Sequence, residues 1–424
     1  MSSEPAGNQG FAANVFKVAG GEALAQALLL ASLPVLTRLY TPQEFGAFGI
    51  FSAISAIGTI IGAARYELAV PIPEKDSESW ALVIASLLIA LLLSLVGTAA
   101  LAFWVPAALN EFWMVFVLLP LHAASNTWIN AFRQWLGRKS EFRWLAQTRI
   151  IYAVVTLTLH IAFGYFGMGA TGLMLGLVIG TFLQLLLTAY RSLKLRPAGI
   201  KAPIVRDTMR KFSRFPRFTL FGHALNSFTW HLPVLLSAAL FSPEIAGYYS
   251  LCMRIMDAPS NFVGRAVQQV YFPEAARRYI GSGSSLALYQ KSLLYLFSAA
   301  ILGFGILAAV GPELIPFILG HEWDEVGMMC RYLAPAYVAQ FCHFPLACML
   351  LIAGRQRLDL LWQLFYFSSV LIGFYFGSYL GGWIGSVYGY GIALFCAYSL
   401  NLVLSYSCAR SEPAGEREKE LCAA

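Results

Sequence analysis

Charged and polar residues recur at helical spacing inside a stretch of this chain that is otherwise hydrophobic. Ser250, Arg254, Asp257, Asn261 and Arg265 follow one another at intervals of three or four residues, so they share one face of a helix. A charge near the centre of a bilayer costs about 2.5–3.5 kcal/mol on insertion scales, and such residues usually face a cavity or a partner. The stripe therefore predicts a hydrated site within the membrane.

Four further apolar stretches carry polar residues with similar spacing. The candidate cationic residues are Arg38, Arg65, Arg149, Arg254 and Arg265, and the candidate polar or ion-coupling residues are Glu22, Gln26, Glu67, Tyr152, His160, His223, Asn226, His231, Asp257 and Asn261. Guanidinium groups stay charged in a low dielectric and hold phosphate oxygens in a bidentate fork. The excess of arginine over acid therefore favours an anionic substrate in a central cavity. No residue is expected to act as a catalyst or to bind a metal.

Each of these residues also has a purely structural interpretation. Arg254 and Asp257, three residues apart, can neutralise each other. Arg38 can reach lipid headgroups from the end of its helix, and three other arginines near the inner surface can act as anchors. Histidines in such stretches are more often hydrogen-bonded core residues than proton carriers. The alignment of five stripes favours a cavity, because independent anchors have no reason to align.

The elements that position these stripes are membrane helices. Hydrophobic residues make up 58% of the 424-residue chain and charged residues 12%, and the mean hydropathy is +0.65, values typical of a polytopic membrane protein. Apolar runs of about 20 residues suffice to cross a bilayer. Twelve spans are expected, at 14–38, 45–70, 79–104, 112–134, 146–166, 168–190, 217–239, 245–270, 288–310, 326–352, 358–379 and 384–407.

Lysine and arginine residues gather on one side of this arrangement. The connections that follow the fourth, sixth, eighth and tenth spans and the C-terminal tail are basic, whereas the opposite loops at 41–44 and 380–383 contain no Lys or Arg. The positive-inside rule makes the basic side cytoplasmic, so both termini are predicted to be cytoplasmic. The net charge of +7 is an orientation signal, and nucleic-acid binding is not expected.

A short motif occurs twice in the same orientation. The sequence LYTP at 39–42, followed by Gly46, returns as LFSP at 240–243, followed by Gly247. A direct repeat of units with an even number of spans predicts two bundles related by an axis along the membrane normal. The expected fold is all-α, with two six-helix bundles, residues 1–200 and 201–424, around the central cavity.

Residues of the first bundle resemble a known family. The runs LPVLTRLYTPQEFG at 33–46 and RYELAVP at 65–71 resemble the N-terminal signature of bacterial polysaccharide-biosynthesis membrane proteins. These are the Wzx-type O-antigen and capsule repeat-unit flippases of the multidrug/oligosaccharidyl-lipid/polysaccharide superfamily. The resemblance implies inner-membrane translocation of undecaprenyl-pyrophosphate-linked oligosaccharide by alternating access, for O-antigen, capsule or exopolysaccharide synthesis.

The same resemblance implies which partners and ions to expect. Membrane lipids surround the protein, and a polysaccharide polymerase and a chain-length regulator are candidate partners. No cofactor is expected apart from a coupling proton or monovalent cation. The glycan itself is not specified by the residues.

Three alternatives remain at this point. A drug/cation antiporter of the same superfamily would share the fold but would favour acidic cavity residues. A major-facilitator transporter would carry a Gly/Asp/Arg-rich loop between spans 2 and 3, where this chain has PIPEKDS at 71–77. A membrane polymerase or ligase would need a large periplasmic loop, so an enzyme is not expected.

Overall fold

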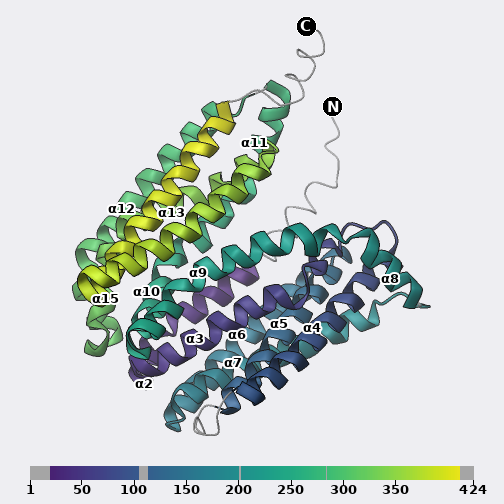
Figure 1. Cartoon of the computed structure of the whole chain (residues 1–424), viewed down its shortest axis with the longest axis horizontal. Coiled ribbons are helices and arrows are strands. Elements are labelled where there is room, and N and C mark those ends of the chain that lie inside the picture. The colour runs from purple at the N-terminus through teal and green to yellow at the C-terminus, as the bar shows by residue number, and fades with distance from the viewer. Residues whose placement is uncertain (1–19, 105–112, 200–201, 283, 411–424) are drawn as a thin grey trace. The chain divides into compact units, whose positions relative to one another are not determined.

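The computed structural model describes residues 20–104, 113–199, 202–282 and 284–410. Within these ranges every regular element is helical (Figure 1), as predicted. The chain divides by its internal contacts into two compact units, unit 1 (Met1–Phe228) and unit 2 (Thr229–Ala424). Both chain ends, and with them the predicted cytoplasmic termini, lie outside the described residues.

Unit 1 contains the helices of the first repeat and a short amphipathic helix. In chain order it consists of the span Gly20–Leu39, which ends in α2 (Leu33–Leu39), α3 (Pro42–Gly62), η1 (Tyr66–Ala69), α4 (Asp76–Trp104), α5 (Trp113–Arg138), α6 (Phe142–Tyr165), α7 (Gly169–Lys194), α8 (Ala202–Lys211), η3 (Phe215–Thr219) and the start of α9 (Leu220–Leu240). Helix α5 packs against α3, α4 and α7. Helix α8 packs on α4, so its contacts place it in unit 1, whereas the predicted division at residue 200 gives it to the second half.

Unit 2 is organised around one central helix. It consists of the rest of α9, then α10 (Pro243–Pro259), η4 (Ser260–Gly264), α11 (Arg265–Ser282), α12 (Leu286–Leu319), η5 (His321–Trp323), α13 (Asp324–Leu346), α14 (Cys348–Ile352) and α15 (Gln356–Arg410). Helix α13 packs against α10, α11, α12 and α15. It therefore forms the core of the unit.

Helix α15 is bent in the middle. Gly381 and Gly382 have non-helical backbone angles and separate it into two arms. The arms lie so close that a Cβ at Gly377 would collide with the carbonyl of Gly385. The bend falls in the predicted loop at 380–383, so the two last predicted spans correspond to the two arms.

Eight helices in the described ranges are long and apolar enough to cross a membrane, counting the bent α15 once. The predicted spans at 112–134, 217–239 and 245–270 fall on α5, α9 and the continuous helix formed by α10, η4 and α11, which are not among these eight. The all-α polytopic class is confirmed, and the number of twelve crossings stays a prediction.

The repeated motif forms the same local structure in both units. Thr41 Oγ1 accepts a hydrogen bond from the Glu44 amide at 3.3 Å, and Glu44 Oε2 accepts one from the Thr41 amide at 2.8 Å. Ser242 Oγ likewise accepts from the Ile245 amide at 3.3 Å. A proline follows each cap at the first helical position, where its missing N–H is not needed. The motif is thus an N-terminal helix cap, used at the start of α3 and α10.

Candidate functional site

A strained turn follows α3 and positions two charged side chains. Ala64 and Arg65 adopt left-handed backbone angles, with φ of 47° and 65°. Such angles cost non-glycine residues on the order of 1–3 kcal/mol each and persist only where surrounding structure holds them. The residues that follow hold the turn in place, because they are buried in the core of unit 1: Tyr66 is 6% exposed, and Ala69 and Val70 are 0% exposed.

This anchored turn forms one wall of a polar pocket of 370 Å³. The pocket is lined by Arg65, Glu67 and Leu68 from the turn and η1, by Asn130, Arg133 and Gln134 from α5, and by Leu145 from α6. Arg133 and Gln134 lie three and four positions after Asn130, so the three α5 residues share one helical face. The pocket lies where α3 and α5 end and α6 begins, on the side predicted to be cytoplasmic.

Arg65 and Glu67 form a buried ion pair at the pocket wall. Arg65 Nη1 lies 3.1 Å from Glu67 Oε1, and Glu67 is only 3% exposed. Glu67 Oε2 and Arg65 Nε are buried and have no hydrogen-bond partner among the described residues. Burial raises the pKa of Glu67, which lies beyond the end of α3, while the hydrogen bond from Arg65 opposes this rise. Unpaired polar atoms in a buried wall are costly, so this pair is suited to an additional polar ligand.

Glu22 connects the pocket to a third arginine. Glu22 Oε2 lies 3.4 Å from Arg133 Nη2, and Glu22 Oε1 lies 3.3 Å from Arg149 Nη2. The Arg149 guanidinium also lies 5.0 Å from the ring centre of Tyr152, a cation–π distance. Three guanidinium groups carry more N–H donors than two carboxylates can accept. The cluster therefore has the charge and the donors to bind phosphate oxygens.

The structure brings together some of the predicted site residues. Arg65 and Glu67 line the pocket, and Glu22, Arg149 and Tyr152 adjoin it through Arg133. Sequence reasoning missed Asn130, Arg133 and Gln134, because Arg133, at the end of the predicted span 112–134, reads as part of the basic connection that follows, whereas α5 continues to Arg138. The missed signal was that 130, 133 and 134 lie four, seven and eight residues after 126, which places all four on one helical face.

The other candidates of unit 1 lie outside this pocket. Arg38 is exposed in the last turn of α2, Gln26 is half-buried in the first span, and His223 and Asn226 are exposed on α9. The ring Nε2 of His160 lies 2.9 Å from the Leu173 carbonyl. The backbone carbonyl of His160 accepts a hydrogen bond from the Tyr40 hydroxyl at 2.6 Å. His160 thus joins α6 to α7 and to the end of α2, which fits its structural interpretation.

A second buried histidine, His122, was not a candidate from sequence. Its Nδ1 lies 2.6 Å from Ser55 Oγ on α3, and its Nε2 lies 3.1 Å from Thr181 Oγ1 on α7. His122 itself is on α5 and 6% exposed. It links three helices of unit 1 through polar contacts in an apolar interior.

The remaining candidates, His231, Arg254, Asp257, Asn261 and Arg265, belong to unit 2. Asp257 is 7% exposed, and its Oδ1 accepts a hydrogen bond from Gln340 Nε2 of α13 at 3.0 Å. Arg265 Nη2 donates to Asn261 Oδ1 at 3.2 Å. A cavity shared by the two halves stays a prediction, since the pocket described above is formed within unit 1.

Residues 35–327 match the protein family described as "Polysaccharide biosynthesis protein". Among curated proteins, the succinoglycan biosynthesis transport protein ExoT of Rhizobium meliloti (strain 1021) is 22% identical over 304 residues, which are 70% of this chain and 60% of ExoT. The chain thus spans about 60% of the length of this relative.

Solved structures of similar fold are transporters. An inward-facing multidrug-resistance MATE transporter of the MOP superfamily has a TM-score of 0.62 at 15% identity, over 94% of each chain. A MOP superfamily transporter from Pyrococcus furiosus, described as having a binding pocket of reversed polarity, has a TM-score of 0.61 at 12% identity, over 94% of this chain and 96% of that one. The Vibrio cholerae MATE transporter VcmN, in its bent form, has a TM-score of 0.58 at 12% identity, over 95% and 97%. The chain has the fold of these transporters.

Proposed function

The chain belongs to the polysaccharide biosynthesis protein family, and on this premise we propose that it carries lipid-linked oligosaccharide repeat units across the bacterial inner membrane. The substrate is an undecaprenyl-pyrophosphate-linked oligosaccharide destined for O-antigen, capsule or exopolysaccharide. It moves from the cytoplasmic to the outer leaflet by alternating access. Similarity to ExoT, a protein named for succinoglycan transport, supports a polysaccharide precursor, and no enzymatic activity is proposed.

The observation that carries this proposal is the arginine pocket of unit 1. Pyrophosphate presents several oxygens at short range, and guanidinium groups bind such oxygens in pairs of parallel hydrogen bonds. Arg65 is held by the anchored turn, so its donors keep a fixed direction without a large entropic cost on binding. Arg133 and Arg149 adjoin it through Glu22. The polar side chains of Asn130 and Gln134 are suited to the sugar hydroxyls next to the pyrophosphate.

Ion coupling is a second part of the proposal. Asp257 is a buried carboxyl that accepts a hydrogen bond from the neutral amide of Gln340. A carboxylate inside a membrane protein needs a proton, a cation or an ion pair to offset its burial. We propose that Asp257 takes up a proton or monovalent cation during the transport cycle. A polysaccharide polymerase and a chain-length regulator are proposed partners.

A drug/cation antiporter is the alternative, because the chain shares its fold with multidrug transporters. A cationic drug would need an acidic site. The pocket of unit 1 and the adjoining Glu22 and Arg149 instead combine three arginines with two carboxylates, and this excess of positive charge would repel a cationic ligand. Transport of an organic cation with retention of activity in Arg65→Ala would favour the antiporter.

The proposal is tested by measuring flipping in reconstituted vesicles. The purified protein is placed in liposomes with fluorescent undecaprenyl-pyrophosphate-linked disaccharide, and the fraction accessible to an external quencher is followed. Arg65→Ala and Arg133→Ala should slow flipping by about 10- to 100-fold, because each lost charged hydrogen bond costs about 1.5–3 kcal/mol. Arg143→Ala, an exposed arginine at the start of α6, is the matched control and should flip normally. Normal flipping by both pocket variants would refute the site.

A further inference from the structure

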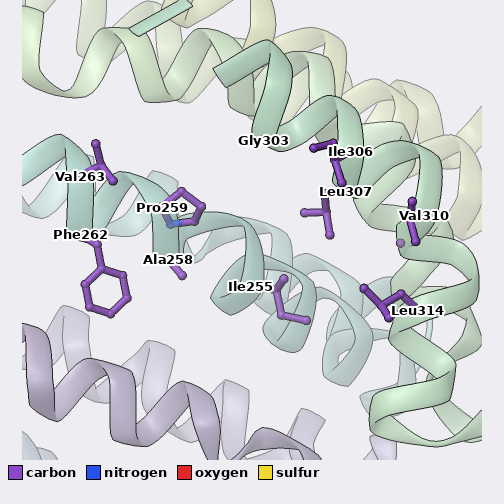
Figure 2. A pocket seen from close by; sticks show the side chains of 11 residues that line it. Ile255, Ala258, Pro259, Phe262, Val263, Gly303, Ile306, Leu307, Val310 and Leu314 are labelled. Carbon is purple, nitrogen blue, oxygen red and sulfur yellow. The ribbon is translucent and has the colours of Figure 1, made fainter. Parts of the chain in front are cut away.

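Unit 2 contains an apolar groove of 550 Å³ (Figure 2). One wall is formed by α10 and η4, including Ile255, Pro259 and Phe262, and the other by α12, including Gly303, Leu307 and Leu314. Ile255 and Pro259 point toward the space between the helices, as Leu307 and Leu314 do from the other wall. The volume falls within the roughly 300–1,000 Å³ that is typical of small-molecule sites.

The groove has a local cause in the packing of these helices. Helices α10 and α12 each pack against α13 but make little contact with each other. Pro259 lacks a backbone N–H, and the π-helix η4 begins at the next residue, which widens the helix there. Gly303 adds no side chain to the opposite wall. The lining residues of α12 extend over about 16 Å at 1.5 Å per residue, so the groove is long and suited to a chain.

A cationic edge borders this groove on the same continuous helix. Arg265 lies three residues after Phe262, and Asn261 lies three residues after Ala258, so each is a neighbour of a groove residue. Arg265 Nη2 donates to Asn261 Oδ1 at 3.2 Å. The groove and its edge together complement a molecule with a hydrocarbon chain and an anionic group.

We propose that the groove holds the hydrocarbon tail of the lipid-linked substrate while its pyrophosphate passes the Asn261–Arg265 edge. This inference rests on the proposed function and specifies how the tail is handled. The surrounding lipid is also apolar, so the groove contributes packing and orientation, and the hydrophobic effect adds little. The tail then follows a defined course along unit 2.

Two glycines of α12 allow a matched test. A Cβ added at Gly303 or at Gly305 meets open space, but only Gly303 lines the groove. Gly303→Phe fills the groove, and Gly305→Phe makes the same change outside it. With undecaprenyl-pyrophosphate-linked disaccharide in liposomes, Gly303→Phe should flip about tenfold more slowly than wild type, as expected for a mispositioned substrate, and Gly305→Phe should match wild type.

A second measurement uses the wild-type protein alone. Undecaprenyl-pyrophosphate-linked disaccharide with a diazirine in its tail should crosslink to residues 255–263 and 303–314, and unlabelled substrate should displace it. A phospholipid with a diazirine in its acyl chain that labels these segments equally, and is not displaced by substrate, would identify the groove as a bulk-lipid crevice and overturn the inference.

The outcomes separate this inference from the function on which it rests. Flipping by wild type and by Gly303→Phe at the same rate, with no tail crosslinks in the groove, would overturn the groove assignment and leave the proposed function standing. Failure of wild type to move the substrate would overturn both.

Discussion

Arg331 donates a hydrogen bond from Nε to the backbone carbonyl of Ala308 at 2.8 Å. Ala308 is four residues before Pro312 in α12, and proline has no N–H to complete the helical hydrogen bond. Arg331 Nη2 also donates to the Ala309 carbonyl at 3.2 Å. A side chain of α13 therefore satisfies carbonyls at a proline position of α12. This bond fastens the two helices that pack together at the core of unit 2.

Arg331→Met should lower the stability of the protein by about 1–3 kcal/mol, because it leaves a carbonyl without a donor in an apolar setting. Pro312→Ala restores an N–H for the Ala308 carbonyl, so the double variant Arg331→Met, Pro312→Ala should recover most of this loss. Thermal unfolding in detergent measures both effects. Pro316→Ala in the Arg331→Met background is the control, because it supplies no donor to Ala308. Equal recovery by both proline substitutions would show a general gain in helix propensity and contradict the specific pairing.

Glu22→Gln should strengthen anion binding to the pocket of unit 1. Glu22 competes with an incoming anion for Arg133 and Arg149. These ion pairs are partly exposed, and each contributes at most about 1 kcal/mol, so inorganic pyrophosphate should bind about two- to tenfold more tightly. Isothermal titration of the solubilised protein gives the affinity.

The matched control for this prediction is Glu141→Gln. Glu141 pairs with Arg191 at 2.6 Å, and neither residue lines the pocket. Its substitution should leave pyrophosphate affinity unchanged. Weaker binding by Glu22→Gln would mean that Glu22 orients the arginines, and the competition argument would be wrong.

Charge distribution predicts the sidedness of two exposed segments. A cysteine introduced at Arg206, in the basic α8, should be protected from a membrane-impermeant maleimide in intact cells, whereas one at Glu322, in η5, should react. Both positions are exposed. The native cysteines are replaced first, since Cys396 is exposed and free. Reaction at Arg206 before permeabilisation would reverse the assigned orientation.

The double variant Arg254→Ala, Asp257→Ala separates a structural pair from a coupling group. If the two residues only neutralise each other, removing one leaves an unpaired charge at a cost of several kcal/mol, and removing both restores export. The coupling proposal predicts that the double variant stays inactive at normal abundance. It also predicts that Asp257→Asn binds substrate without completing transport. Measuring export at matched expression levels distinguishes the structural pair from the coupling group. Full activity of the double variant would remove Asp257 from the mechanism.

Sequence reasoning worked where one local signal determines structure. Periodic hydrophobicity predicted the helices, and the predicted loop at 380–383 falls where the structure bends at Gly381 and Gly382. The repeated motif predicted equivalent segments. The caps formed by Thr41 and Ser242 explain why both copies have a hydroxyl residue followed by proline. These features depend on residues close to one another in sequence.

The pocket depended on information that local patterns do not contain. Arg133 and Glu22 are 111 residues apart, and their ion pair follows from helix packing. The left-handed angles of Ala64 and Arg65 also run against intrinsic preference, so no propensity argument predicts them. The polar network of His122 has the same origin, because Ser55 and Thr181 come from two other helices.

The shared helix caps also bear on how the two units diverged. They give each residue of α3 a counterpart 201 positions later in α10 or η4, and by this correspondence Arg254 and Asp257 of unit 2 stand where unit 1 has Ala53 and Ala56. One copy of the duplicated framework carries charges where the other carries alanine. The two units are consequently not interchangeable, and a tandem fusion of unit 1 with itself would lack the charges that Arg254 and Asp257 supply.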